Sequence, residues 1–321
     1  MVQIGLIGIG AGAAAALLFA SVASGSPLSV LLFYLAPLPI LIAAIGWSHW
    51  AGLVAAALAA LSLAAVFGAK FFVAFLLSVG APGWWLGYLA LLARPGATPG
   101  ALEWYPVGHL VAWAAAFGSL AVLSVILYFG FDEERFTAAL HAGFERVIRS
   151  QIGAPEDGPL VIRGIGDPKR FIDFLVMIIP PAAAALAMLT HAFNLWLAAS
   201  IVRLSGRLRR PWPDLAAMRL PRLAPAAVVA ALVGGFFPGM IGIVANVVAA
   251  SLVVAYAALG LAVLHMITRG LASRGLVLAA TYAALIIFGW PILAMVLIGL
   301  IDAAIDLRAR IARRRPPVPR Q

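Results

Sequence analysis

The stretch MIGIVANVVAASLVVAYAALGLAVLH, residues 240–265, contains no Asp, Glu, Lys or Arg. A helix of this length and composition can cross the hydrocarbon core of a bilayer, which takes about 20 apolar residues. Similar runs recur along nearly the whole chain, at residues 2–23, 28–47, 50–67, 71–93, 107–130, 180–202, 223–237 and 276–305. The sequence therefore predicts an all-α fold, a polytopic transmembrane helical bundle.

The composition excludes a water-soluble protein. Of 321 residues, 64% are hydrophobic and 11% are charged, whereas soluble domains have about 45–50% and about 25%. The net charge of +10 comes from arginines between the apolar runs, where the positive-inside rule places them, so we expect no nucleic-acid partner. The chain has no Cys, which excludes disulfides and thiolate metal sites, and we expect neither a metal nor a cofactor.

The last apolar run decides the topology. Residues 276–305 would form a helix of about 45 Å, too long for one crossing without a strong tilt. A turn at Gly289-Trp290-Pro291 divides the run into a short hairpin, giving ten spans out of an expected eight to ten. Both termini then lie on the cytoplasmic side, and fifteen of the 22 basic residues face inward. The arginine-rich and alanine-rich composition indicates a bacterial protein of the cytoplasmic (inner) membrane.

Changes in polarity divide the chain into an N-terminal transmembrane bundle (1–130), a polar segment (131–179), a C-terminal transmembrane bundle (180–307) and a basic tail (308–321). In the polar segment, Phe136, Leu140, Phe144 and Val147 recur at helical spacing and predict an amphipathic helix at the membrane interface. Asp167-Pro168 predicts the start of a second short helix that ends at Ile179. Pro180-Pro181 would then begin the sixth span.

Prolines predict breaks within the spans, because a proline removes a backbone hydrogen-bond donor. The expected structural kinks are at Pro37, Pro39, Pro82, Pro238 and Pro291. Transporters often place their binding sites at such broken helices.

Three polar residues within the spans are candidate ligand-binding residues. His191 and Asn194 share a helix face near the middle of a span, and Asn246 lies in a neighbouring one. They could bind a ligand or relay protons, or they could form hydrogen bonds that hold helices together. Asp302 and Asp306 are expected to pair with arginines of the tail or of the 203–222 loop.

Enzyme signatures are absent from the sequence, so we expect no enzyme. An intramembrane aspartyl protease needs carboxylates on separate helices, whereas Asp302 and Asp306 are expected on one helix. His-Glu-x-x-His and Gly-x-Ser-x-Gly motifs are also missing.

Arginines outside the spans are expected to contact a cytoplasmic partner or anionic lipid of the bilayer. They are Arg207, Arg209, Arg210, Arg313, Arg314 and Arg315. Active transport would need a separate ATPase or other membrane subunit, and the loop from Arg203 to Arg222 would be its docking site.

Several stretches resemble the YybS-like predicted bacterial membrane proteins, a family of unknown function. They are Tyr34-Leu35-Ala36-Pro37-Leu38-Pro39, Ile45-Gly46-Trp47, Arg210-Pro211-Trp212-Pro213-Asp214, Arg219-Leu220-Pro221, Leu259-Gly260-Leu261-Ala262-Val263, Gly299-Leu300-Ile301-Asp302 and Asp306-Leu307-Arg308. The resemblance implies an integral membrane protein, and more distantly kinship with the substrate-binding membrane subunits of energy-coupling-factor transporters. It implies no catalytic residue.

Two hypotheses for function follow. The first is a transport or small-molecule-binding membrane component, in which the kinked helices surround a cavity holding His191, Asn194 and Asn246. The alternative is a non-transporting membrane scaffold that recruits partners through its polar loops.

Overall fold

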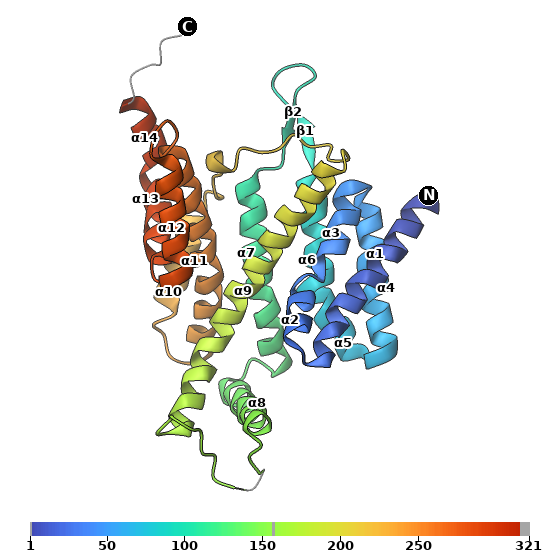
Figure 1. The fold of residues 1–321 in the computed structure, drawn as a ribbon, viewed down its shortest axis with the longest axis vertical. Helices are drawn as coiled ribbons and strands as arrows, with labels where there is room; N and C mark the ends of the chain where they lie inside the picture. Colours follow the sequence, from blue (N-terminus) through green and yellow to red (C-terminus); the bar gives the residue numbers. More distant parts are fainter. Residues whose placement is uncertain (1, 156–157, 315–321) are drawn as a thin grey trace.

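The computed structural model describes residues 2–155 and 158–314, and the chain forms a bundle of helices (Figure 1). Within these residues, seven helical segments have the length and hydropathy of membrane spans: Val2–Ser24, Pro27–Gly46, His49–Phe67, Ala69–Ala90, Val107–Tyr128, Pro168–Leu204 and Gly239–Ile267. Three shorter apolar helices are α10 (Ala224–Gly234), α12 (Arg274–Phe288) and α13 (Ile292–Ile305). The predicted all-α polytopic bundle is therefore confirmed.

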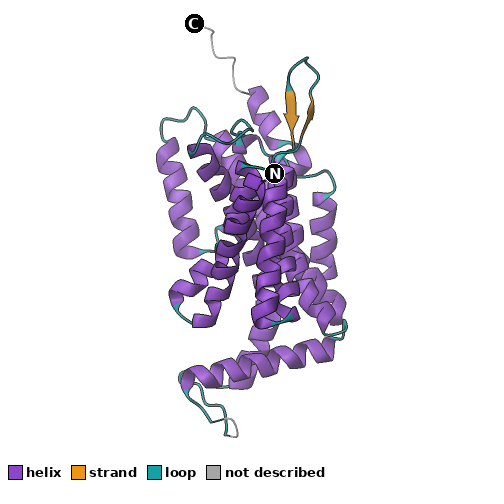
Figure 2. Ribbon diagram, turned by 90° about the vertical axis from the view of Figure 1, so that its right-hand side faces the viewer, coloured by secondary structure: helices purple, strands orange, loops and turns teal. Residues whose placement is uncertain are grey.

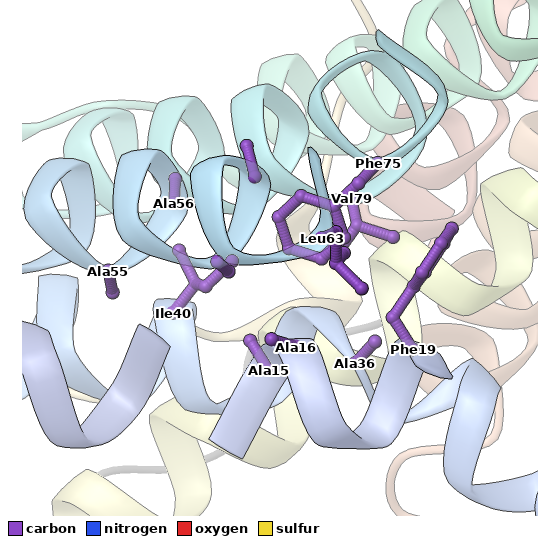
Figure 3. Close-up of a cluster of buried hydrophobic side chains, with 12 residues drawn as sticks. Ala15, Ala16, Phe19, Ala36, Ile40, Ala55, Ala56, Leu63, Phe75 and Val79 are labelled. Atoms are coloured by element: carbon purple, nitrogen blue, oxygen red, sulfur yellow. The ribbon is translucent and has the colours of Figure 1, made fainter. Parts of the chain in front are cut away.

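The N-terminal part of the bundle is built on small side chains. Its elements are α1 (Val2–Ala20), a 3-10 turn (Ser21–Ser24), α2 (Pro27–Tyr34), α3 (Pro37–Gly46), α4 (His49–Phe67), α5 (Ala69–Phe75), a π-helical turn (Leu76–Gly80) and α6 (Ala81–Ala90). Phe19, Ile40, Leu63 and Phe75 fill the space among buried alanines of α1 and α4 and Ala36, which directly precedes α3 (Figure 3). A side chain at Gly12 would meet the backbone of Ala55 at 2.8 Å, so this glycine lets α1 approach α4 closely.

The remaining elements surround one long central helix. They are β1 (Ala93–Pro95), β2 (Leu102–Trp104), α7 (Val107–Tyr128), α8 (Glu133–Ile152), α9 (Pro168–Leu204), a 3-10 turn (Leu215–Ala217), α10, α11 (Gly239–Ile267), α12, α13 and α14 (Leu307–Arg314). Strands β1 and β2 form an antiparallel hairpin in the loop after α6, with Arg94 opposite Glu103. Helix α9 packs against α3, α7 and α11 and so connects the two halves of the bundle.

Three of the five predicted proline kinks lie at helix boundaries, whereas Pro39 lies within the first turn of α3 and does not interrupt it. Helix α2 ends before Pro37, Pro238 directly precedes α11, and Pro291 directly precedes α13. At Pro82 the helix does not stop, and the π-helical turn Leu76–Gly80 comes just before it. The wider turn accommodates a residue that has no N–H to offer the preceding turn.

The break predicted at Pro180-Pro181 is wrong. Asp167 caps the helix as expected, accepting hydrogen bonds from the amides of Lys169 and Arg170, but α9 runs unbroken for 37 residues. The proline φ angle fits a helix, so the costs are the lost hydrogen bonds to the preceding turn and the crowding of each ring against that turn. That turn adjoins a small cavity lined by both prolines, so the rings meet little crowding there.

The amphipathic helix α8 lies across one end of the bundle, below the spans (Figure 2). Asp132 caps it by accepting a hydrogen bond from the amide of Arg135. Phe136 is buried and, with Leu140, packs on residues of α7 and α11. Val147 is 58% exposed. Phe136 and Leu140, half of the predicted apolar stripe, therefore pack against the bundle itself.

The opposite end collects arginines. The first turn of α1, the β hairpin, the 205–222 loop and α14 all lie there (Figure 1). Helix α12 leaves this arginine-rich end from Arg274, and α13 returns to it, where Asp306 pairs with Arg219 of the loop. The predicted hairpin at 289–291 is thus confirmed, and the arginine-rich end is expected to face the cytoplasm.

Cysteine labelling tests this orientation in a chain that has no cysteine of its own. We expect a membrane-impermeant thiol reagent to label Trp290→Cys in intact cells and Arg310→Cys only after permeabilisation. Val161→Cys, beyond α8, and Arg94→Cys, on the β hairpin, are the controls for the two sides. Labelling of Arg310→Cys in intact cells would contradict the cytoplasmic placement.

Candidate functional site

A cavity of about 840 Å³ lies among α7, α9 and α11 at the arginine-rich end. Its walls are mostly apolar, and they include Val107, Leu110, Val111 and Ala114 from α7, Ala192, Leu195 and Ala199 from α9, and Ala258, Leu261 and Ala262 from α11. The volume falls within the range of about 300–1,000 Å³ that is usual for small-molecule sites.

Small residues create the space. Ala192 and Ala199 are seven residues apart and so share one face of α9, and Ala258 and Ala262 share a face of α11. Farther from the arginine-rich end the same helices close up, because Met188 is buried against residues of α7 and α11. The cavity is thus a widening at one end of an otherwise packed bundle.

The 205–222 loop forms the roof. It crosses from the end of α9 to the start of α10 (Figure 1), and Trp212, Asp214 and Ala216 face the cavity. A buried ion pair holds it: Arg308 Nη2 lies 2.8 Å from Asp302 Oδ2, and Arg308 Nη1 donates to the Ala216 carbonyl at 2.8 Å.

Two more ion pairs fasten the roof. Arg219 binds both carboxylate oxygens of Asp306 at 3.0 Å, and Arg269 donates to Asp214 at 2.6 Å. The expected pairing of Asp302 and Asp306 with arginines is confirmed. The two aspartates do not share a helix face, however, because Asp306 adopts a left-handed conformation (φ 50°) that ends α13.

The polar groups of the cavity gather under the roof. They are Arg210, Asp214, His265, Arg269, Arg274 and Tyr282. His265 Nε2 and the Tyr282 hydroxyl lie 3.0 Å apart and form a hydrogen bond. Apolar walls with a few convergent polar groups at one end are typical of a site for a small molecule.

The charges at this end are held in different ways. The hydrogen bond from Arg269 lowers the pKa of the Asp214 carboxyl, so this pair persists at neutral pH and is lost only as the pH falls through the lowered pKa. Arg210 donates to the Ala90 carbonyl at 3.2 Å, and burial lowers the pKa of its guanidinium. Within residues 2–155 and 158–314 this carbonyl is the hydrogen-bond partner found for Arg210, and a partly desolvated guanidinium with a neutral partner favours the approach of an anion.

His191 and Asn194 lie on a neighbouring face of α9 and do not line this cavity. Asn194 Nδ2 donates to the Tyr34 carbonyl at 2.9 Å and to the Thr190 carbonyl at 2.8 Å. Tyr34 ends α2 just before the break at Pro37. The amide thus binds a carbonyl at the break, which is the helix-holding role considered for it.

His191 is 2% exposed beside Phe117, and neither ring nitrogen has a hydrogen-bond partner among the described residues. Asn246 lies elsewhere, next to Gly235 and the small cavity at Pro180 and Pro181. That cavity is about 15 Å along α9 from His191. The structure therefore brings His191 and Asn194 together but not Asn246, and ligand binding by these three residues stays a prediction.

The arginines predicted to contact partners or lipid have different surroundings. Arg207 stacks on the Trp47 ring at 4.5 Å, and Arg209 reaches the Trp47 carbonyl at 3.5 Å. Arg210 lines the cavity. Arg313 is exposed on α14, whereas the side chain of Arg314 and all of Arg315 lie outside the described part of the chain.

Sequence reasoning missed the cavity because its walls are ordinary alanines, leucines and valines from helices far apart in the chain. Asp214 was one available signal, since it is the single acid in the arginine-rich 203–222 loop. His265 was another, because it ends an uncharged span. In residues 2–155 and 158–314, no group of three or more His, Asp or Glu side chains is close enough to hold a metal.

A family model described as "Predicted membrane protein (DUF2232)" matches residues 13–303. No curated protein and no solved structure matches the chain. The resemblance to YybS-like proteins and the distant kinship with energy-coupling-factor transporter subunits stay predictions.

The role of Asn194 predicts a loss of stability on substitution. Asn194→Ala should lower the free energy of unfolding by about 1–2 kcal/mol, because it leaves the Tyr34 carbonyl without its donor in an apolar environment. Asn246→Ala is the matched control and should change it by less than about 0.5 kcal/mol. Thermal unfolding of the detergent-purified protein measures both, and equal midpoints would contradict the assignment.

Proposed function

This chain belongs to the family of predicted membrane proteins described as DUF2232, and we propose that it is a membrane component that binds or transports a small molecule. The proposed binding site is the cavity at the arginine-rich end. We further propose that it lies in the cytoplasmic membrane of a bacterium and binds its ligand without chemical conversion.

The main support for this proposal is that the cavity of about 840 Å³ combines apolar walls with convergent polar groups at one end. A packed helical bundle has few voids larger than a water molecule, so a space of this size points to a ligand. The three ion pairs that hold the roof also support a binding site, because they keep the loop in position above an open space.

Transport would require a route past the packed region beneath the cavity, where Met188 is buried. Such a route would need a conformational change. A separate ATPase or other membrane subunit is the proposed energy source, with the 203–222 loop as its docking site.

The alternative function, a membrane scaffold, draws support from the outer part of α8. Val147 and Ile152 are 58% and 46% exposed on this helix. Exposed apolar side chains on an amphipathic helix fit either a partner helix or the membrane surface.

Filling the cavity tests the binding function. We expect native mass spectrometry of the protein, extracted gently from membranes, to show a bound small molecule. Ala192→Trp and Ala199→Trp should reduce its occupancy at least tenfold, because an indole at either position projects into the cavity. Leu186→Trp, on the exposed side of the same helix, is the control and should retain the molecule. Equal occupancy in all variants, or no bound molecule in the wild type, would contradict the assignment of the binding site.

Crosslinking tests the scaffold alternative. A photocrosslinker at Val147 should capture the same second protein in repeated membrane preparations if α8 recruits a partner, and Val147→Asp should release that protein. Capture of lipid and of the chain's own helices alone would remove the support for a scaffold.

A further inference from the structure

Two guanidinium groups at the polar end of the cavity have no ion-pair partner in the described part of the chain. Arg210, Arg269 and Arg274 line the cavity together with a single carboxylate, Asp214, which Arg269 binds. Among the described residues, no carboxylate forms an ion pair with Arg210 or Arg274. The polar end of the cavity therefore carries an uncompensated positive charge.

The rest of the cavity suits a hydrocarbon chain. Below the arginines, the walls formed by α7, α9 and α11 consist of side chains such as Leu110, Leu195 and Leu261. A fully water-soluble anion would leave this apolar surface uncovered, whereas an uncharged lipid would leave the arginines without a partner. The two halves of the cavity together select a molecule with an acidic head and an apolar tail.

The cavity also adjoins the outside of the bundle. Trp196 of α9 and Tyr282 of α12 both line it, and they are 48% and 41% exposed. Helix α12, described along its full length, contains no buried residue and covers this side only loosely. A molecule already in the membrane could therefore enter sideways between α9 and α12.

On these observations, and resting on the proposed binding function, we propose that the cavity binds an anionic amphiphile, with a phosphate or similar head at Arg210 and Arg274 and its hydrocarbon chain between α9 and α11. Guanidinium groups bind such heads through paired hydrogen bonds. The amphiphile could be a two-chain membrane lipid or a free single-chain compound.

A protection assay in the cysteine-free chain tests the inference. Ala199→Cys protein in phosphatidylcholine nanodiscs is labelled with N-ethylmaleimide, in the presence of oleoyl lysophosphatidic acid, monoolein or inorganic phosphate. We expect lysophosphatidic acid to slow the labelling at least tenfold, at concentrations where monoolein and phosphate have no effect. Leu204→Cys, exposed at the end of α9 and outside the cavity, is the control reporter, and its labelling should not respond to lysophosphatidic acid.

Arginine variants test the head group. Arg274→Gln, at an exposed position, and Arg210→Gln should each raise the half-protecting concentration at least fivefold. Arg209→Gln, which lies on the same loop but outside the cavity, should leave it unchanged. If neither variant shifts this concentration, the assignment of the acidic head is overturned. An unchanged half-protecting concentration in Arg274→Gln alone would show that Arg210 binds the head without Arg274, and it would refute the pairing of the two arginines.

The remaining outcomes separate the inference from the proposed function. Equal protection by monoolein would support the binding site but refute the requirement for an acidic head. Protection by inorganic phosphate alone would refute the requirement for a hydrocarbon chain. If nothing protects, the inference fails, and the cavity-filling variants decide the site independently. Protection by dioleoyl phosphatidic acid as well would identify a membrane lipid, whereas protection by the single-chain compound alone would identify a free amphiphile.

Discussion

Asp302 and Arg308 form an ion pair that is almost completely buried, with 3% and 6% of their side chains exposed. Removing one partner of such a pair costs about 3–5 kcal/mol, because the other charge is left uncompensated. Here the pair also binds the roof of the cavity, since Arg308 donates to the Ala216 carbonyl. This contact holds the 205–222 loop above the helices, and the surface pairs at Asp214 and Asp306 add to it.

A second constraint comes from the apolar surroundings of the spans, where every backbone polar group needs a partner. The break between α2 and α3 meets this constraint through Asn194, which binds the Tyr34 carbonyl. Helix α9 therefore has two roles on two faces. One face ties it to the N-terminal half of the bundle, and the other, with Ala192 and Ala199, lines the cavity.

Much of the fold could be predicted from the sequence because lipid allows so few alternatives. Long apolar runs must be helices, and the prolines at 37, 238 and 291 mark where those helices end. The predicted break at Pro180 and Pro181 was wrong, because a helix tolerates prolines where the preceding turn has space beside it. That space depends on Phe136 and Asn246, which belong to other helices and cannot be placed from local sequence.

The site was harder to predict than the fold. Their polarity within a span marked His191 and Asn194 as candidate ligand-binding residues, but Asn194 binds a carbonyl at the α2–α3 break and neither residue lines the large cavity. The cavity instead depends on how far apart α7, α9 and α11 lie at one end, which follows from packing over the whole bundle. Arg210 was among the arginines expected to contact a partner or lipid, but no sequence feature placed it or Arg274 beside a cavity.

The most direct measurement is a cryo-electron-microscopy map of the protein in nanodiscs that contain oleoyl lysophosphatidic acid. We expect density for a phosphate between Arg210 and Arg274, continuous with a chain that runs between α9 and α11 beneath the 205–222 loop. A map in which the loop drops into the cavity, or in which side chains fill the space between these helices, would contradict it.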